Sequence, residues 1–267
     1  MRALFRIARR LLSPLNKFLL VLFTMRINVL QKIVVMSKIV AVSVTEPLYV
    51  IFGSIFFRNT WTYRDSDRAI HPWARKILHI MRVKYVVFNP YNFEFAFKRP
   101  YIIISNHLSH FDIPLIYATF PKESIRMIAK KELFYIPIFG WAMKMAGCIT
   151  IDRKNARQAL KDLAVARKMM LEGVRVWIAP EGTRSRTGEL GPFKKGGFKI
   201  ALDTGAIIVP VTIIGSNKIL PPKTFDLSRD EKVEIHIGKP IDTAQYQLKD
   251  IKKLIADTEN EIKKVKT

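Results

Sequence analysis

The stretch YIIISNHLSHFDIP, residues 101–114, changes from an apolar run to a crowd of polar side chains within a few positions. Its first four residues have the composition of a buried strand, and His107, Ser109, His110 and Asp112 follow shortly after. Burial disfavours polar side chains unless they are paired, so this crowding at a strand end indicates a functional site. We therefore expect the chemistry of the protein to lie where this strand ends.

Apolar runs of the same kind recur along the chain and alternate with helical segments. The expected strands are YIIIS (101–105), IRMIA (125–129), CITI (148–151), VRVWIA (174–179), AIIVPVTII (206–214) and KVEIHI (232–237). The expected helices are 155–173, which ends at Gly173, then 197–204, and a charged helix from Thr243 onward. This alternation predicts an α/β domain with a largely parallel sheet flanked by helices, in which sites gather at the carboxyl ends of strands.

The composition is that of a basic globular protein. A chain of 267 residues with 49% hydrophobic residues is long enough for one large domain or a domain with an appendage. Its 45 Lys and Arg residues exceed its 22 Asp and Glu residues, so it favours an anionic partner: nucleic acid, a membrane surface or an acidic protein. Cys148 is the only cysteine, which excludes an intrachain disulfide and suits a cytosol-facing catalytic domain.

The N-terminal part predicts a membrane-associated helical region. On a helical wheel, residues 2–19 separate a basic face from a face rich in Leu and Phe, which is typical of a helix lying flat in a membrane interface. From Phe18 to Phe57 the chain is strongly apolar. Its charged residues nevertheless keep every uncharged run shorter than the about 18 residues that a simple spanning helix needs. We expect monotopic attachment on the cytoplasmic face. The alternatives are a segment spanning the membrane from about residue 33 to 57 and a soluble helical subdomain.

Residues 58–75 are more polar and are interpreted as a connector that ends near Pro72. We therefore divide the chain into residues 1–75, with the membrane-associated helices and the connector, and residues 76–267, with the α/β domain.

His107 and Asp112 have the spacing of a catalytic pair. A turn after the strand can bring the carboxylate to one ring nitrogen of the imidazole, leaving the other nitrogen free as a base. One alternative is that Asp112 merely caps the following helix, IPLIYATF. A second is a nucleophilic Ser109 activated by His110, but the G-x-S-x-G elbow is absent. Cys148 is interpreted as a small buried hydrophobe, and no histidine has metal-ligand spacing, so we expect no metal.

A second motif, APEGTRSRTGELGPFKKGGF (179–198), follows the expected strand 174–179. Its glycines let the backbone approach a ligand closely, and Thr183, Arg184 and their neighbours supply donors suited to phosphate. The G-x-x-x-x-G-K-[ST] order of a P-loop is missing. A flexible basic loop is the alternative, but Glu181 beside the strand end favours an ordered site.

Four blocks in this order resemble the glycerolipid acyltransferase family. The first is N-H-x-x-x-x-D, formed by Asn106, His107 and Asp112, and the third is P-E-G-T-R-S at residues 180–185, trailed by PFKKG. The second block resembles residues 130–153, and the fourth resembles IVPVTIIG at 208–215. Together the blocks extend over residues 101–215, whereas the N-terminal region matches only loosely.

The resemblance implies a glycerol-3-phosphate acyltransferase-like fold and an acyl-transfer reaction. It implies that His107, oriented by Asp112, deprotonates the sn-2 hydroxyl of lysophosphatidic acid, which attacks an acyl thioester and gives phosphatidic acid without a covalent enzyme intermediate. The residues implied for the acceptor's phosphate are Glu181, as organiser of the loop, with Gly182, Thr183 and Arg184. The basic positions that would add to phosphate or thioester binding are Arg153 and one of Lys130 or Lys131.

The resemblance also bears on partners. The donor would be acyl-coenzyme A or an acyl-acyl-carrier-protein, both anionic, with no further cofactor and no nucleic acid. Acceptor and product are amphiphiles, so a membrane leaflet is the expected surface. Two alternatives stay open: an acyltransferase acting on glycerol-3-phosphate or another lysophospholipid, and a basic membrane- or nucleic-acid-binding module without catalysis.

Overall fold

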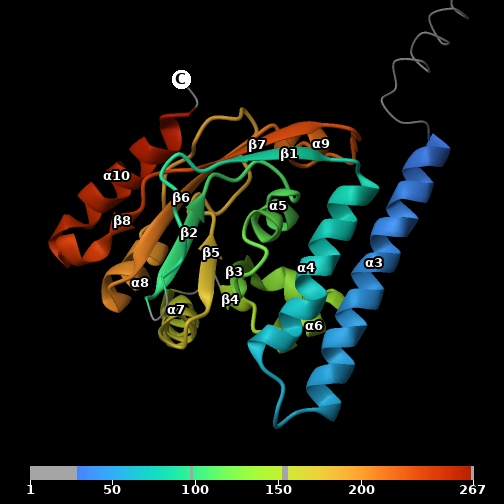
Figure 1. The fold of residues 1–267 in the computed structure, drawn as a ribbon, viewed down its shortest axis with the longest axis horizontal. Helices are drawn as coiled ribbons and strands as arrows, with labels where there is room; N and C mark the ends of the chain where they lie inside the picture. Colours follow the sequence, from blue (N-terminus) through green and yellow to red (C-terminus); the bar gives the residue numbers. More distant parts are fainter. Residues whose placement is uncertain (1–28, 97–98, 152–155, 266–267) are drawn as a thin grey trace, which may run out of the picture.

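The computed structural model describes residues 29–96, 99–151 and 156–265. Within these ranges an eight-stranded sheet lies between helices (Figure 1). Its strands are β1 (Lys84–Phe88), β2 (Tyr101–Ser105), β3 (Ile125–Lys130), β4 (Ile149–Ile151), β5 (Arg175–Ile178), β6 (Ile207–Ile214), β7 (Lys232–Ile237) and β8 (Ile241–Asp242). They are ordered β1-β7-β6-β2-β5-β3-β4, with β8 paired to β6.

Strand β2 is central and leads into the site. All five of its residues are buried, and it pairs in parallel with both β5 and β6. The pairs β3–β5, β3–β4 and β1–β7 are also parallel, while β7 and β8 run antiparallel to β6. These parallel pairs confirm the prediction of a largely parallel sheet. The prediction was possible because strands buried on both faces appear in a sequence as continuous apolar runs.

Helices cover both faces of this sheet. They are α3 (Val29–Phe56), α4 (Tyr63–Ile80), α5 (Asp112–Thr119), α6 (Phe139–Met145), α7 (Ala156–Leu171), α8 (Gly196–Thr204), α9 (Ser216–Ile219) and α10 (Ile251–Lys263), with 3₁₀ turns η1 (Lys131–Tyr135), η2 (Thr243–Gln245) and η3 (Leu248–Asp250). Ile103 belongs to the apolar cluster on the side of α4 and α5, whereas Ile102 and Ile104 belong to the cluster under α7, α8 and α10. Successive residues of a strand point to opposite faces, so β2 contributes to both cores.

Two expected elements differ from the structure. The expected connector over residues 58–75 is wrong from residue 63 onward, because α4 begins at Tyr63 and continues through Pro72. Its polar composition hid an amphipathic helix that buries Ala69, Ala74, Ile77 and other residues on one side. The C-terminal helix begins at Ile251 rather than at Thr243, and the two 3₁₀ turns η2 and η3 precede it. The division of the chain at residue 75 stays a prediction, and α4 runs across it.

A buried arginine fixes α4 against the sheet. Arg126 on β3 has no exposed surface and donates to the Asp67 carboxylate and to the Tyr63 carbonyl, each at 2.6 Å, and also to the carbonyl of Ala146. A buried guanidinium is costly unless every donor is paired, so these contacts hold α4 and the end of α6 together at β3. Helix α3 packs along the outside of α4 (Figure 1).

Helix α3 is the one element among the described residues that is long and apolar enough to cross a membrane. It buries Val35 and Val50 toward the protein but exposes many large apolar side chains, including Ile33, Phe52 and Phe56. Such a face is what a helix needs to contact lipid. The amphipathic helix expected over residues 2–19 lies outside the described residues.

Candidate active site

The imidazole of His107 meets the carboxylate of Asp112 just beyond the carboxyl end of β2. The distance from His107 Nδ1 to Asp112 Oδ2 is 2.7 Å. An ionised carboxylate only accepts hydrogen bonds, so Nδ1 carries the proton and Nε2 is left free to act as a base. The His107 side chain is 19% exposed, whereas that of Asp112 is fully buried. Substrate can therefore reach the imidazole but not the carboxylate.

Three further donors converge on the Asp112 carboxylate. Its Oδ2 accepts from the backbone N–H of Leu108 at 2.7 Å and of Ser109 at 2.9 Å, and its Oδ1 accepts from the Ser216 hydroxyl on α9. Charge-assisted hydrogen bonds of this kind compensate for the burial of an ionised group. Both backbone donors precede α5, so the alternative that Asp112 serves to cap that helix is wrong.

The strands on either side of β2 hold the turn that carries His107. The Asn106 amide donates to the Ile213 carbonyl of β6 at 2.9 Å and accepts from the Ile213 N–H at 2.8 Å. On the other side, Trp177 of β5 packs edge-on against the His107 ring, with centroids 6.3 Å apart, and its Nε1 donates to Ser105 Oγ at 3.0 Å. Such supporting contacts fix the orientation of a catalytic side chain.

The E-G-T-R loop is packed directly on the backbone of His107. Glu181 accepts from the His107 N–H through Oε1 and from the Gly191 N–H through Oε2, both at 2.8 Å. The Ser185 N–H donates to the His107 carbonyl at 2.8 Å. Gly182 has a φ of +72°, in the left-handed region that glycine adopts without strain. These contacts argue against a flexible surface loop.

A pocket of about 350 Å³ opens over His107. Its apolar lining comes mainly from β3, η1 and β5, and Lys130, Arg184 and Lys223 contribute positive charge. No Asp or Glu is among the residues that line this pocket in the described part of the chain. A pocket that combines an apolar wall with cationic side chains suits a ligand that has both an anionic group and a hydrocarbon chain.

His110 lines the same pocket but differs from His107 in its surroundings. Partial desolvation, with smaller contributions from the charges of Arg184 and His107, lowers the pKa of His110 to about 4. Its imidazole is therefore neutral at pH 7. The Ser109 hydroxyl donates to the Leu220 carbonyl at 2.9 Å, which gives no support to a serine nucleophile activated by His110.

The structure gathers most of the expected binding residues around this pocket. Gly182, Thr183, Arg184 and Lys130 line it. Glu181 is buried behind the loop, with both carboxylate oxygens engaged by backbone N–H groups. Lys131, the first residue of η1, is not among the described residues that line the pocket. Arg153 lies outside the described residues.

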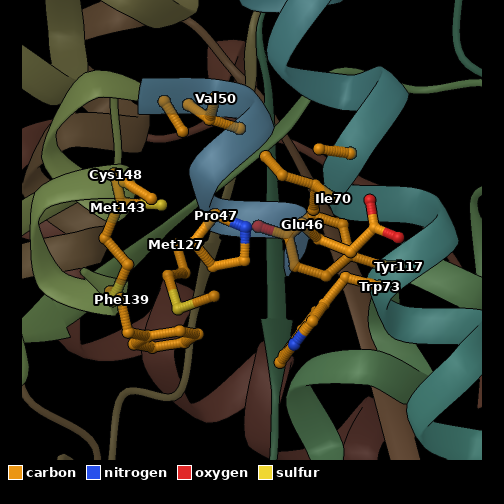
Figure 2. A pocket seen from close by; sticks show the side chains of 13 residues that line it. Glu46, Pro47, Val50, Ile70, Trp73, Tyr117, Met127, Phe139, Met143 and Cys148 are labelled. Carbon is orange, nitrogen blue, oxygen red and sulfur yellow. The ribbon is translucent and has the colours of Figure 1, made fainter. Parts of the chain in front are cut away.

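An apolar cavity adjoins the site, and Met127 lines both spaces (Figure 2). Its walls come from α3, α4, α5, α6 and β3. Cys148 lies here and is half-buried, and desolvation raises the pKa of its thiol, which argues against a reactive thiolate. Among the described residues, no three His, Cys, Asp or Glu side chains form a group that could hold a metal ion.

Three contributors escaped sequence reasoning: Ser216, Trp177 and Lys223. Ser216 directly follows Gly215 after β6, the neighbour of β2, and Trp177 lies on β5, its other neighbour. The rule that sites gather at the ends of adjacent parallel strands offered a signal for the first two once the strand order was known. Lys223 lies in an irregular loop that carries no local signal.

Comparisons with known proteins show what the chain is similar to. The family model described as Acyltransferase matches residues 84–214. The chloroplast 1-acyl-sn-glycerol-3-phosphate acyltransferase BAT2 of Brassica napus is 39% identical over 142 residues, which cover 53% of this chain and 41% of the relative. The protein named "Probable 1-acyl-sn-glycerol-3-phosphate acyltransferase" of Mycoplasma pneumoniae is 30% identical over 189 residues, covering 67% of this chain and 70% of the relative.

A solved structure extends the similarity to nearly the whole chain. The crystal structure of the 1-acyl-sn-glycerophosphate (LPA) acyltransferase PlsC from Thermotoga maritima matches with a TM-score of 0.73 at 25% identity, covering 90% of this chain and 96% of that one. The match spans only 41% and 39% of the chloroplast relatives of Brassica napus and Arabidopsis thaliana. On the sequence match to the Mycoplasma relative and on the shared fold, this chain belongs to the acyltransferase family that includes the 1-acyl-sn-glycerol-3-phosphate acyltransferases.

Proposed function

We propose that the protein is a 1-acylglycerol-3-phosphate O-acyltransferase, which transfers a fatty acyl group from a thioester to the sn-2 hydroxyl of lysophosphatidic acid and forms phosphatidic acid. The observation that carries this proposal is the His107–Asp112 pair, which leaves Nε2 of His107 free. His107 lines a pocket with an apolar wall and cationic side chains. The names of the relatives in Brassica, Arabidopsis and Mycoplasma support the choice of acceptor.

The reaction needs one base that returns its proton. Nε2 of His107 takes the proton of the sn-2 hydroxyl as the oxygen attacks the thioester carbonyl carbon. The C–S bond then breaks, and the thiolate recovers a proton from the imidazolium. Asp112 stays ionised throughout and stabilises the imidazolium while it exists. A positioned base such as His107 typically contributes about 10²- to 10⁴-fold in rate.

The acceptor's phosphate is assigned to the loop beside His107. Arg184 supplies a charge-assisted contact, and Gly182 and Thr183 lie next to it in the lining. Glu181 acts through the loop, because its carboxylate holds the backbone of His107 and Gly191. Of the two lysines, Lys130 is the one that lines the pocket, although the neighbouring Glu132 partly offsets its charge at 3.3 Å. Arg153 keeps its proposed role in phosphate or thioester binding.

The proposal also covers the acyl donor and the location of the enzyme. Acyl-coenzyme A and acyl-acyl-carrier-protein are both anionic, and a chain with a net charge of +23 suits either. The exposed apolar face of α3 supports monotopic attachment to a leaflet on the cytoplasmic face, where both lipid substrates are held. We include no cofactor, metal or nucleic acid.

The test measures acyl transfer to lysophosphatidic acid and to glycerol-3-phosphate side by side, each with coenzyme A and acyl-carrier-protein thioesters. His107→Ala should abolish turnover, whereas His79→Ala, on the exposed surface of α4, should not. Turnover only with glycerol-3-phosphate would transfer the assignment to the alternative acceptor. Folded protein that binds liposomes but acylates neither acceptor would favour a binding module instead.

A further inference from the structure

The loop between α9 and β7 presents an aromatic side chain to solvent at the edge of the active-site pocket. Phe225 is 94% exposed, more than any other large apolar side chain recorded as exposed in the described residues. A single exposed apolar residue is ordinary on a protein surface. Phe225 differs from such residues in its position beside the pocket and in the hydrogen bonds that hold its loop.

The loop holds Phe225 outward by its own hydrogen bonds. The Thr224 N–H and hydroxyl both reach the Pro221 carbonyl, at 3.3 Å and 3.0 Å, and the Leu227 N–H donates to the Phe225 carbonyl at 3.0 Å. Leu227 itself is buried in the cluster under α4 and α5. The loop is therefore anchored on both sides of a residue that it leaves uncovered.

The same loop joins two features already described. Pro222 and Lys223 line the active-site pocket, so Phe225 follows the lining after one intervening residue. At its other end, Asp226 lies 3.4 Å from Lys32 near the start of α3. An exposed ion pair contributes little stability, but it places the loop beside that helix.

The part of α3 next to the loop is itself apolar and exposed. Leu30 is 66% exposed and Ile33 is 60% exposed, one on either side of Lys32. Phe225 thus continues the apolar face of α3 toward the pocket. Lys223 adds a positive charge between Phe225 and the site, and the described residues show no ion pair that would neutralise it.

We infer that the loop of residues 221–228 is a second lipid contact, in which Phe225 enters the interface of an anionic leaflet and sets the pocket's mouth at the headgroup level. An aromatic side chain flanked by a lysine is suited to this depth, with the ring among the upper acyl chains and the ammonium among the phosphates. In this position a lipid acceptor reaches His107 with its hydrocarbon chain still in the leaflet. That last consequence rests on the proposed function, whereas the contact itself does not.

The contact is tested by fluorescence in reconstituted vesicles of phosphatidylcholine and phosphatidylglycerol. Cys148 is the only cysteine, so Cys148→Ala with Phe225→Cys gives a full chain with one site for an environment-sensitive label. The matched control is Leu248→Cys in the same background, a residue 62% exposed in η3. We expect lipid-attached quenchers to reduce the signal of the label at 225 at least twofold more than at 248, and aqueous iodide to do the reverse.

Two results would overturn the contact. The first is a label at 225 that iodide quenches as strongly as the label at 248. The second is a label shielded from iodide but untouched by lipid quenchers, because protein, either residues 1–28 or a second copy, would then cover the loop.

The functional arm compares Phe225→Glu with the conservative Phe225→Leu. Phe225→Glu should lower the rate with long-chain lysophosphatidic acid in vesicles about tenfold, while Phe225→Leu retains most of it. Both should match the unchanged protein on a short-chain acceptor dissolved as monomers. Equal loss on the two acceptors would overturn the proposal, since it would indicate a damaged pocket. If no variant acylates anything but lipid quenching persists, the proposed function fails and the membrane contact stands.

Discussion

Asp112→Asn separates the charge of the buried carboxylate from its hydrogen bonds. The asparagine oxygen can take the place of Oδ2, where His107 Nδ1, the Leu108 N–H and the Ser109 N–H converge. Its amide nitrogen then faces the Ser216 hydroxyl, which can accept instead of donating. The fold and the imidazole tautomer should survive, and only the negative charge beside the imidazolium is lost.

The size of the effect follows from that charge. Two unit charges about 4 Å apart interact by about 4 kcal/mol at an effective dielectric constant near 20. With partial compensation by the neutral hydrogen bond that remains, we expect a loss of about 2–4 kcal/mol, which is about 30- to 900-fold in kcat. Asp112→Ala should be worse for folding, because it leaves two buried backbone donors unpaired at about 1–3 kcal/mol each.

The assay pairs initial rates of acyl transfer with thermal unfolding of the same samples. We expect Asp112→Asn to lose activity with little change in Tm, and Asp112→Ala to lose both. The reasoning is refuted if Asp112→Asn keeps more than a tenth of the rate, or if it unfolds as early as Asp112→Ala.

Four further predictions address separate parts of the structure. Arg184→Ala should raise the acceptor KM about 10- to 100-fold with a smaller change in kcat, because it removes a charge-assisted contact to a non-reacting phosphate; a pure kcat defect would contradict this. Ser216→Ala removes one donor from the buried carboxylate and should lower kcat about tenfold at unchanged KM, and steady-state kinetics with no loss would exclude a positioning role. The folded-state pKa of His110, about 4, lies below the ordinary 6.5, so the unfolded chain takes up a proton first and stability is lost as pH falls from about 6.5 toward 4. His110→Gln should flatten that part of a Tm-against-pH curve; an unchanged slope would mean that the desolvation is absent. Replacing Ile33 and Phe52 on the exposed face of α3 by Glu should lower the fraction of protein in the vesicle pellet, and an unchanged fraction would show that this face does not contact lipid.

The six expected strands were found from short runs rich in apolar residues. Strands β2 and β6 are buried on both faces and form continuous apolar runs, whereas β7 alternates exposed and buried residues. Strand β1 was missed although its aromatic and β-branched residues favour a strand, and its exposure at the sheet edge is a property of the tertiary structure. Helix α4 was missed over residues 63–75 because its polar face dominates the composition and Pro72 was taken as an end. The spacing of Ala69, Ala74, Ile77 and Leu78 on one helical face was a usable signal.

The sequence by itself determined the alternation of strands and helices, the family blocks and the five-residue spacing that lets His107 and Asp112 meet. These are local properties, set by composition and by the reach of one turn. Only the tertiary structure decided that Ser216 completes the donors around Asp112 from a strand end 104 residues away, and that Glu181 grips the backbone of His107 from 74 residues away. The reason is that parallel pairing brings the carboxyl ends of β2, β5 and β6 to one edge, and side chains that meet there across crossovers leave no trace in the spacing of the chain.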